Sequence, residues 1–393
     1  DMELAIKQQL SYCKVGGFID GYANFDSQFF KISPAEALVM DPQERQILEQ
    51  CWKVFENAGY TKKRIQEEFH GNIGVFVGVT RTGYDLYGPK LWENGKQILL
   101  GTSFSSMSNR ISYFFDLKGP CMSIDTMCSS SLTALHEACE HIRRGECEMS
   151  LLASANIYTH SATYKQFCQK RMLSLKGRCY AFSADADGFV PGEGVGAILL
   201  KPLSKAIKDH DQIHGIIRST VVNHCGKTSG FTVPSPDAQK DMIINALRKA
   251  NINPEEITYV EAHGTGTKLG DPIEIAGLTK AYRKYTNRKQ FCAIGSVKTN
   301  IGHCEATSGL AGVLKVILQM KHGMLAPSLF SECLNPLIDF QNSPFYVQRE
   351  LSEWERPISC KDGISVPGKR LAGVSSFGAG GSNAHVILEE YVE

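Results

Sequence analysis

Short apolar runs rich in β-branched residues recur along the chain and alternate with segments of helical spacing. These runs suit buried strands, because strands that are covered on both faces show no polar alternation. They lie at residues 72–79, 149–157, 194–200 and 214–222. Residues 237–252 and 271–285 have an amphipathic pattern that predicts helices between the later strands. Since no linker rich in Pro and Ser divides the alternation, the pattern predicts one large α/β unit.

Helix-start signals mark residues 33–37, 41–59 and 271–285. In each stretch a Ser or Asp suited to capping is followed by proline at the first helical position and by a glutamate that reaches back in a capping box. The three sets are Ser33, Pro34 and Glu36; Asp41, Pro42 and Glu44; and Asp271, Pro272 and Glu274. Gly59 is expected to end the second of these helices.

Two segments of the chain share one weak pattern. Residues 121–142 ("CMSIDTMCSSSLTALHEACEHI") and residues 291–318 each run from an apolar strand, through a short polar turn, into an apolar helix rich in small residues. A duplicated α/β half has this appearance. The pattern therefore favours two similar halves.

Composition and charge narrow the class of protein. The 393 residues are 42% hydrophobic, and 42 Lys and Arg against 41 Asp and Glu leave a net charge of +1. This balance gives no general attraction for nucleic acid or for an anionic membrane, and we expect neither as a partner. There is no bilayer-length apolar run, and the opening residues lack the basic and apolar parts of a signal peptide. We therefore expect a cytoplasmic protein.

The cysteines suggest neither a metal module nor a disulfide scaffold. Thirteen of them are scattered along the chain without a C-x-x-C pair. Most are expected to be reduced and buried thiols, as is usual in a cytoplasmic protein. A cysteine with a special role has to be identified by its surroundings.

Cys128 has such surroundings, in "SIDTMCSSSLTAL" at residues 123–135. Apolar residues repeat at helical spacing after it, which places it where a strand turns into a helix. Unpaired N–H groups and the positive end of the helix dipole lie close to such a position. They lower the pKa of a thiol and offer amide donors to an oxyanion. The alternative is a packed core thiol, which is the usual state of a lone cysteine.

Two histidines occupy similar junctions. His263 opens "HGTGT" directly after the strand-like "ITYVEA", and His303 ends "VKTNIGH", five residues beyond Lys298. A lone histidine is more often a structural group. Two of them at strand ends, where α/β sheets place their active sites, favour a functional role.

The glycine-rich stretch 375–388 ("SSFGAGGSNAHVIL") completes the set of candidate motifs. Its glycines permit a tight backbone turn that aims amides at a reacting oxygen, and a simple hairpin turn is the alternative. The phosphate-loop and dinucleotide fingerprints are absent. Residues 185–196 ("DADGFVPGEGVG") imitate a calcium loop but contain a proline and lack the bidentate glutamate, so we interpret them as a structural turn that leads into a strand.

In this order and spacing, "DTMCSSSL", "HGTGT", "VKTNIGH" and "SFGAGGSNAH" closely resemble the ketosynthase domain of modular polyketide synthases, which are thiolase-like condensing enzymes. The resemblance runs from "GGFIDGYANF" near the start of the chain to Leu388. "DTMCSSSL" and "YFFDLKGP" are further similar to synthases whose acyltransferase is a separate protein, the trans-acyltransferase type.

This resemblance implies a five-layered αβαβα fold made of two halves, about 1–212 and 213–393. It also implies a homodimer that acts on substrates carried on the phosphopantetheine of acyl carrier protein. No metal and no bound cofactor is expected for catalysis. The reaction implied is polyketide chain elongation by decarboxylative Claisen condensation, in which the enolate of malonyl carrier protein attacks an acyl chain held on the enzyme.

The motifs transfer roles to individual residues. Cys128 matches the acylated nucleophile, and His263 and His303 match the histidines that serve decarboxylation and condensation. Lys298 matches the lysine that supports the second histidine. The backbone N–H groups of Cys128 and Ala379 match the oxyanion hole. Positions implied for the substrate pocket are Phe377, Thr265, Thr267 and Asn300.

The chain departs from the family pattern at its beginning. Family members begin with a strand and loop of the type "IAIIGMSGRFPG", whereas this sequence starts downstream of that point. We therefore expect the first half to lack its first strand, and we expect a larger parent protein.

Competing enzyme classes fit the motifs less well. A degradative thiolase is expected to use a second cysteine in a C-x-G motif, and a starter-forming enzyme Cys, His and Asn. A decarboxylase variant carries Gln at the position of Cys128, and a cysteine hydrolase needs a G-x-C-x-G elbow. A transacylase that only passes chains on, or a silent platform that docks carrier proteins, stays an alternative. Since transfer-only relatives lack the histidine of "HGTGT", His263 favours true elongation.

Overall fold

The apolar runs in the first half of the chain form a mixed sheet. A computed structural model describes residues 2–101, 103–361 and 364–392. Three strands of this sheet follow the predicted runs, and the order of the sheet is β2-β1-β3-β4. Only β4 runs antiparallel to its neighbour. The strands are β1 (Ile73–Gly78), β2 (Cys121–Ile124), β3 (Met149–Asn156) and β4 (Gly194–Leu200).

The second half of the chain forms a second mixed sheet, in the order β5-β14-β13-β6-β7-β9. β14 runs antiparallel to both of its neighbours, β13 and β5, while β6, β7 and β9 run parallel to β13. The strands are β5 (Ile216–His224), β6 (Tyr259–Glu261), β7 (Cys292–Gly295), β9 (Phe345–Val347), β13 (Leu371–Phe377) and β14 (Ser382–Glu389). The predicted strand at 214–222 thus extends to His224.

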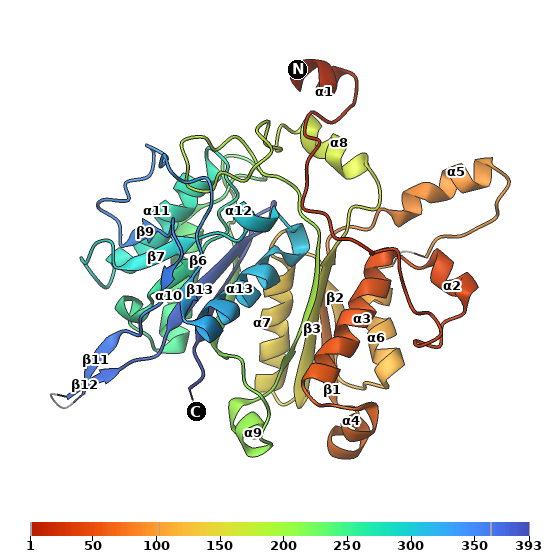
Figure 1. Cartoon of the computed structure of the whole chain (residues 1–393), viewed down its shortest axis with the longest axis horizontal. Helices are drawn as coiled ribbons and strands as arrows, with labels where there is room; N and C mark the ends of the chain where they lie inside the picture. Colours follow the sequence, from red (N-terminus) through yellow and green to blue (C-terminus); the bar gives the residue numbers. More distant parts are fainter. Residues whose placement is uncertain (1, 102, 362–363, 393) are drawn as a thin grey trace.

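Helices cover both sheets and fill the space between them (Figure 1). The outer face of the first sheet packs on α3 (Pro42–Asn57), α4 (Lys62–Phe69) and α6 (Phe104–Phe115). The outer face of the second packs on α10 (Pro236–Ala250) and α11 (Gly270–Arg283). Between the sheets lie α7 (Ser130–Arg143) and α13 (Ser308–His322).

Alternation along β1 shows how the strands serve two cores. Val75 and Val77 pack in the cluster with the outer helices, whereas Phe76 packs in the central cluster with Leu132 of α7 and Leu310 of α13. Because successive side chains of a strand point to opposite faces, a fully apolar strand is needed here. This is the physical reason for the uninterrupted apolar run of β1.

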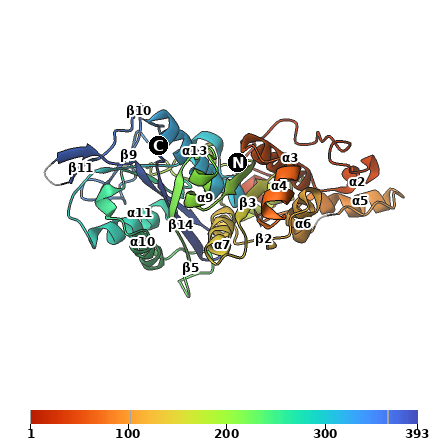
Figure 2. The ribbon, with the colours of Figure 1, turned by 90° about the horizontal axis from the view of Figure 1, so that it is seen from below.

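Shorter elements complete the chain, and Figure 2 shows α2 with α5 at one end of the molecule and β11 at the other. The helices are α1 (Met2–Lys7), α2 (Pro34–Val39), η1 (Tyr84–Tyr87), α5 (Gly88–Glu93), α8 (Ala162–Gln169), α9 (Leu203–Lys208), η2 (Pro254–Glu256), α12 (Lys298–Ile301) and η3 (Glu305–Thr307). Two ladders pair β8 (Met324–Leu325) with β10 (Ser352–Glu353) and β11 (Ile358–Lys361) with β12 (Ile364–Pro367).

The predicted caps of α2 and α3 are confirmed, but their capping boxes are wrong. The Glu36 N–H donates to Ser33 Oγ at 3.1 Å, and the Gln43 N–H donates to Asp41 Oδ1 at 2.8 Å. Glu36 and Glu44 do not reach back, because both carboxylates bind the guanidinium of Arg110 on α6. A charged partner is a stronger hydrogen-bond donor than a backbone amide.

The end of α3 follows its prediction. Gly59 lies just beyond this helix with φ 73°, the left-handed conformation that favours glycine after a helix.

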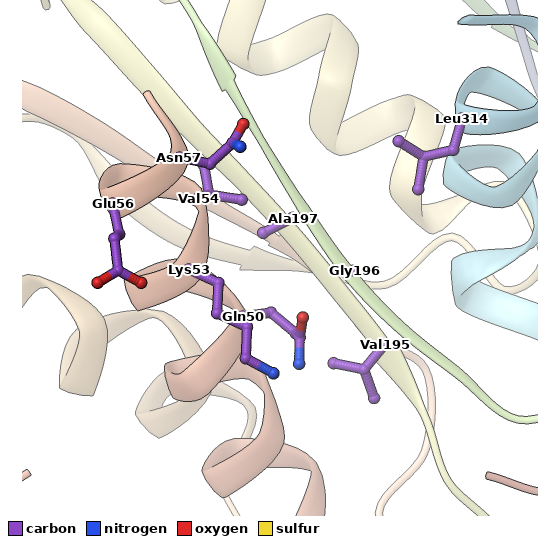
Figure 3. A pocket seen from close by; sticks show the side chains of 9 residues that line it. All are labelled: Gln50, Lys53, Val54, Glu56, Asn57, Val195, Gly196, Ala197 and Leu314. Carbon is purple, nitrogen blue, oxygen red and sulfur yellow. The ribbon is translucent and has the colours of Figure 1, made fainter. Parts of the chain in front are cut away.

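The first sheet has an open groove along β4 (Figure 3). Val195, Gly196 and Ala197 of β4 form its floor, α3 forms one wall, and Leu314 of α13 lies on the other side. The second sheet differs at the corresponding place. There β14, which runs antiparallel to β13 as β4 does to β3, carries β5 on its outer side. Within the described residues, the edge of β4 has no such partner.

The folded chain shows the state of its cysteines. Most of the described cysteines are buried free thiols, as predicted. In the part of the chain that the structure describes, no group of three or more His, Cys, Asp or Glu residues is placed to hold a metal ion. No helix in that part has the length and apolar character needed to cross a membrane.

Candidate active site

Cys128 lies in the sharp turn between β2 and α7, as the sequence predicts. Met127 before it adopts φ 58°, a left-handed conformation that is uncommon outside glycine, and α7 begins at Ser130. The carbonyl of Cys128 accepts hydrogen bonds from Ser376 Oγ at 2.7 Å and Ser308 Oγ at 3.2 Å. Cys128 as a whole residue keeps some exposure to solvent. The strained turn thus presents the thiol and ties it to the second half of the chain.

The pKa of the Cys128 thiol corrects a prediction. Burial raises it to about 12, and the charge of Glu305 acts in the same direction. Lys298, the Ala379 N–H and Arg81 act to lower it but do not prevail. Desolvation of a thiolate thus outweighs the nearby N–H groups and the helix dipole. The expectation that this junction lowers the thiol pKa is wrong, and the sulfur carries its proton at neutral pH.

The glycine-rich stretch forms the hairpin turn between β13 and β14. The Ala379 N–H in this turn acts on the sulfur of Cys128 and lowers the pKa of its thiol. A Cβ on Gly378 would lie 2.2 Å from the carbonyl oxygen of Thr126, so only glycine lets the turn come this close to the backbone beside Cys128. The two interpretations of the stretch, a hairpin turn and an amide donor, are therefore compatible.

The two candidate histidines lie side by side. The ring centroids of His263 and His303 are 5.4 Å apart, and the ring planes meet at 86°. His303 Nδ1 accepts the N–H of Glu305 at 3.2 Å, and His263 Nδ1 accepts the N–H of Phe377 at 3.4 Å. In a neutral imidazole one nitrogen accepts and the other donates. These bonds therefore place the proton of each ring on Nε2.

Both rings are neutral near pH 7. Burial and then the charge of Lys298 hold the pKa of His303 well below its ordinary value, and the pKa of His263 is lowered by the same two causes and by His303. Lys298 itself is buried, which lowers its pKa, while Glu261 and Glu274 act to raise it. A lysine near two rings thus disfavours a second positive charge on either of them.

The carboxylates at the start of α11 hold the loop of His263 rather than the helix. Glu274 accepts the N–H groups of His263 at 2.7 Å and Gly264 at 2.8 Å. Asp271 accepts the N–H groups of Phe182 at 2.8 Å and Gly266 at 3.2 Å. Burial raises the pKa of Asp271 to about 6 and that of Glu274 to about 7.

The capping set predicted at Asp271, Pro272 and Glu274 is therefore wrong. α11 begins at Gly270, before the proposed cap, and loop 263–267 folds over this start. Backbone N–H groups of that loop donate hydrogen bonds to the two carboxylates. Buried N–H groups need partners, and the carboxylates of Asp271 and Glu274 supply the acceptors.

The residues implied for a substrate pocket separate into three kinds. Phe377 is 8% exposed and its ring lies 5.5 Å from that of His263, so it belongs to the site. Thr265 and Thr267 shape the loop after His263, with their hydroxyl oxygens 3.3 Å apart. Asn300 is exposed on α12 and accepts a hydrogen bond from the hydroxyl of Thr299 at 3.2 Å.

Sequence reasoning missed a buried cluster that joins the two halves. The Glu305 carboxylate accepts hydrogen bonds from Tyr158 Oη at 2.5 Å and from Arg81 Nε at 3.2 Å. Phe189 packs against the ring of His303 at 5.1 Å, in the segment interpreted only as a turn that leads into a strand. Since Arg81 and Glu305 are 224 positions apart, no local pattern signals their contact.

Comparison with protein families identifies both halves of the chain. The model of "Beta-ketoacyl synthase, N-terminal domain" matches residues 3–206, and that of "Beta-ketoacyl synthase, C-terminal domain" matches residues 214–332. Together they include Cys128, His263 and His303. The glycine turn lies beyond both matches.

Curated relatives are much longer than this chain. It is 54% identical over 385 residues to polyketide synthase PksL of Bacillus subtilis, covering 97% of this chain and 8% of that protein. It is 51% identical over 382 residues to polyketide synthase ThaG of Burkholderia thailandensis, covering 97% of this chain and 7% of that protein. The chain thus spans less than a tenth of these relatives.

Solved structures of ketosynthase domains share the fold. The oxazolomycin ketosynthase domain OzmH KS7 of Streptomyces albus matches with a TM-score of 0.94 and 45% identity, over 98% of this chain and 66% of that one. The ketosynthase from module 6 of the bacillaene synthase of Bacillus subtilis matches with a TM-score of 0.89 and 43% identity, over 99% of this chain and 65% of that one.

Proposed function

The chain belongs to the beta-ketoacyl synthase family of condensing acyltransferases, as a ketosynthase domain of the modular polyketide synthase kind, and we propose that it lengthens a polyketide chain by decarboxylative Claisen condensation. The observation that carries this proposal is the pair of neutral imidazoles 5.4 Å apart, each with its proton on Nε2. A transfer of acyl groups needs one nucleophile, whereas an enolate also needs donors to its oxygen.

Acyl transfer to the enzyme is the first step. The acyl chain arrives as a thioester on the phosphopantetheine arm of acyl carrier protein, and the Cys128 sulfur attacks its carbonyl carbon. The N–H groups of Cys128 and Ala379 bind the oxyanion of the tetrahedral intermediate. The carbon–sulfur bond to the carrier then breaks, and the proton of the Cys128 thiol ends on the carrier thiol. Because the step as a whole neither gains nor loses a proton, it needs no net acid or base. This suits a thiol with a raised pKa.

Condensation follows on a malonyl thioester. Its carboxylate leaves as CO₂, and the electron pair of the broken bond forms an enolate, whose oxygen accepts the Nε2–H groups of His263 and His303. The enolate carbon attacks the acyl carbon on Cys128 and forms the new carbon–carbon bond. The bond from that carbon to sulfur breaks, Cys128 takes up a proton from solvent, and a β-ketoacyl thioester remains on the carrier.

Lys298 keeps both rings in the state that this step requires. Its charge lowers the pKa of each imidazole, so neither becomes a cation at neutral pH. A neutral imidazole donates a proton in a hydrogen bond and gives none away, which stabilises an enolate without trapping it as the protonated thioester. The supporting role implied for Lys298 thus acts through the protonation state of His263 and His303.

The same proposal extends to fold and partners. The order of outer helices, sheet, central helices, sheet and outer helices supports the five-layered αβαβα arrangement of thiolase-like enzymes. β2 lies at an edge of the first sheet and Cys121–Ile124 all stay partly exposed, which supports a homodimer with a second copy along this edge. Acyl carrier protein brings the substrates. The similarity of "DTMCSSSL" and "YFFDLKGP" to trans-acyltransferase synthases supports loading of the carrier by a separate acyltransferase.

The groove along β4 is the place proposed for the expected first strand. β5 pairs antiparallel to β14 in the second sheet, and a strand in the same relation to β4 would complete the first. Val195 and Ala197 pack toward the α3 side, and Ile198 and Leu200 pack in the central cluster. A strand added here is covered on both faces and has to be apolar throughout.

Peptide mapping of the acylated enzyme tests the first step. The chain is incubated with a synthetic acyl-pantetheine thioester, digested and analysed by mass spectrometry. The proposal predicts one acyl adduct on the peptide of Cys128 and none in Cys128→Ala. An adduct on another residue contradicts the assignment of the nucleophile, and no adduct at all supports a silent docking platform instead.

A further inference from the structure

We propose that His224 is a positioning residue that holds the glycine turn 378–381 so that the Ala379 N–H stays aimed at the reacting centre on Cys128. The inference rests on the proposed function, because it concerns the oxyanion hole of that reaction. It assigns a role to an exposed residue outside the motifs that identify the family.

The turn needs an external support. Its own hydrogen bonds are few: the Gly381 N–H donates to the Gly378 carbonyl at 3.0 Å, and the Gly378 N–H donates to the Ser382 carbonyl at 2.7 Å. Gly380 and Gly381 have φ 133° and 99°, which side chains rarely adopt. Glycines allow this shape but leave the backbone many others. An oxyanion donor acts only when it is held in place before the reaction.

The end of β5 supplies that support through two neighbouring carbonyls of the turn. His224 Nε2 lies 2.8 Å from the Gly380 carbonyl oxygen, and the Cys225 N–H donates to the Gly381 carbonyl at 2.8 Å. His224 is the register partner of Ser382 on β14. The pairing of β5 with β14 therefore continues beyond its last residue pair onto the turn itself.

The hydrogen bond at the second ring nitrogen of His224 fixes the tautomer of the neutral ring. Nδ1 accepts the N–H of Gly226 at 2.9 Å, so the proton of a neutral ring sits on Nε2 and is donated to the Gly380 carbonyl. Both contacts are satisfied by one tautomer. A Cβ on Gly381 would lie 2.9 Å from Nε2, so glycine there lets the imidazole lie against the turn.

Contacts on two sides thus fix the position of the turn. On one side Gly378 lies against the Thr126 carbonyl beside the nucleophile, and on the other His224 binds Gly380. Phe231, 85% exposed, adds a contact, since a Cβ on Gly380 would lie 3.4 Å from its ring. Movement of the turn away from Cys128 requires the bond between His224 and Gly380 to break.

The exposure of His224 separates this role from a merely structural one. The side chain is exposed, and exposed substitutions usually change the free energy of unfolding by no more than about 0.5 kcal/mol. A loss of rate without a loss of stability would therefore report on the turn. His214 offers a matched control, because it is exposed and precedes β5 at the opposite end of the strand.

The experiment compares two reactions of the same sulfur in His224→Phe, His224→Gln and His214→Phe. Acylation of Cys128 by an acyl-pantetheine thioester forms a tetrahedral oxyanion, whereas alkylation by iodoacetamide displaces iodide and forms none. Removing one oxyanion donor typically costs a hundred-fold or more, and loosening it costs less. We expect acylation to slow about tenfold in His224→Phe, alkylation of Cys128 to slow less because the Ala379 N–H also lowers the pKa of the thiol, and the unfolding temperature to stay unchanged. His224→Gln, which keeps an N–H donor, recovers part of the rate, and His214→Phe matches the wild type.

The outcomes distinguish the inference from the proposed function. Wild-type acylation on Cys128 with an unchanged acylation rate in His224→Phe overturns the inference alone. An equal fall in acylation and alkylation, or a clear fall in the unfolding temperature, also overturns it, because the role is then structural. A wild-type chain that is not acylated on Cys128 overturns the proposed function itself.

Discussion

His263 and His303 face each other as perpendicular rings with centroids 5.4 Å apart, and a backbone N–H occupies the Nδ1 of each. The donors come from different parts of the chain, Phe377 at the end of β13 and Glu305 after the second histidine motif. With Nδ1 of each ring occupied, each Nε2–H is left as a donor, and the proposed reaction uses both for one enolate oxygen. The arrangement fits the proposed role of the pair, which is to stabilise a developing charge rather than to remove a proton.

Replacing His263 by alanine is expected to separate the two half-reactions. Acylation of Cys128 does not need this ring and should stay within about twofold of the wild type, while condensation should fall by about a hundred-fold or more. Mass spectrometry of the enzyme and of the carrier product measures the two steps separately. His322→Ala, in an exposed histidine on α13, serves as the control. Normal chain extension by His263→Ala would show that the division of roles is wrong.

The raised pKa of Cys128 predicts how its alkylation depends on pH. Only the thiolate reacts, and with a pKa of about 12 its fraction grows about tenfold for each pH unit from 6 to 9. The rate of iodoacetamide labelling at Cys128 should therefore climb through this range without a plateau. Cys333, which is exposed, should be labelled before Cys128 at pH 7.4. A plateau for Cys128 near pH 7, measured by peptide mapping, would instead indicate a low pKa.

The fold follows closely from the sequence where a local pattern decides the structure. The apolar runs predicted β1, β3, β4 and β5. The reason is plainest for β1, which is buried along its whole length and has no polar side chain, whereas β5 contains the exposed Arg218. The end of α3 at Gly59 was predictable because it depends only on the backbone conformation of that residue. The pairing order of the strands lies outside such patterns, since it depends on which distant segments meet.

The sequence motifs indicated which residues form the candidate site, but they did not predict its electrostatics. The helix start beside Cys128 suggested a low thiol pKa, whereas burial and Glu305 decide it. Glu274 looks like a capping residue in sequence, yet it holds the amides of His263 and Gly264. His224 carries no signal of its own, because its contact with Gly380 exists only once β5 pairs with β14. Desolvation and long-range contacts are properties of the folded chain.

Glu274→Ala is expected to destabilise the loop that carries His263. The change leaves the N–H groups of His263 and Gly264 without their acceptor, and each unpaired buried group costs about 1–3 kcal/mol. Chemical denaturation should show a loss of about 2 kcal/mol or more, and condensation should slow more than acylation. Glu67→Ala, in an exposed ion pair of α4, should change stability by no more than about 0.5 kcal/mol. Equal stability of the two variants contradicts the role given to Glu274.

An apolar strand supplied to the β4 groove is expected to stabilise the chain. A variant extended at its N-terminus by a flexible linker and an apolar β-branched strand should unfold at a higher temperature, because the strand covers Val195 and Ala197 and pairs the open edge. The matched control has the same extension with lysine at alternate strand positions. Scanning calorimetry compares the two. Equal unfolding temperatures would mean that the groove does not take a strand.

Single-turnover condensation tests the central claim most directly. The domain is first loaded with an acyl chain on Cys128, freed of excess thioester, and then mixed with malonyl carrier protein. The account predicts that the acyl adduct disappears at the rate at which a β-ketoacyl carrier, longer than the acyl chain by two carbons, appears. Transfer of the unchanged acyl chain to the carrier, or an adduct that persists on Cys128, would contradict it.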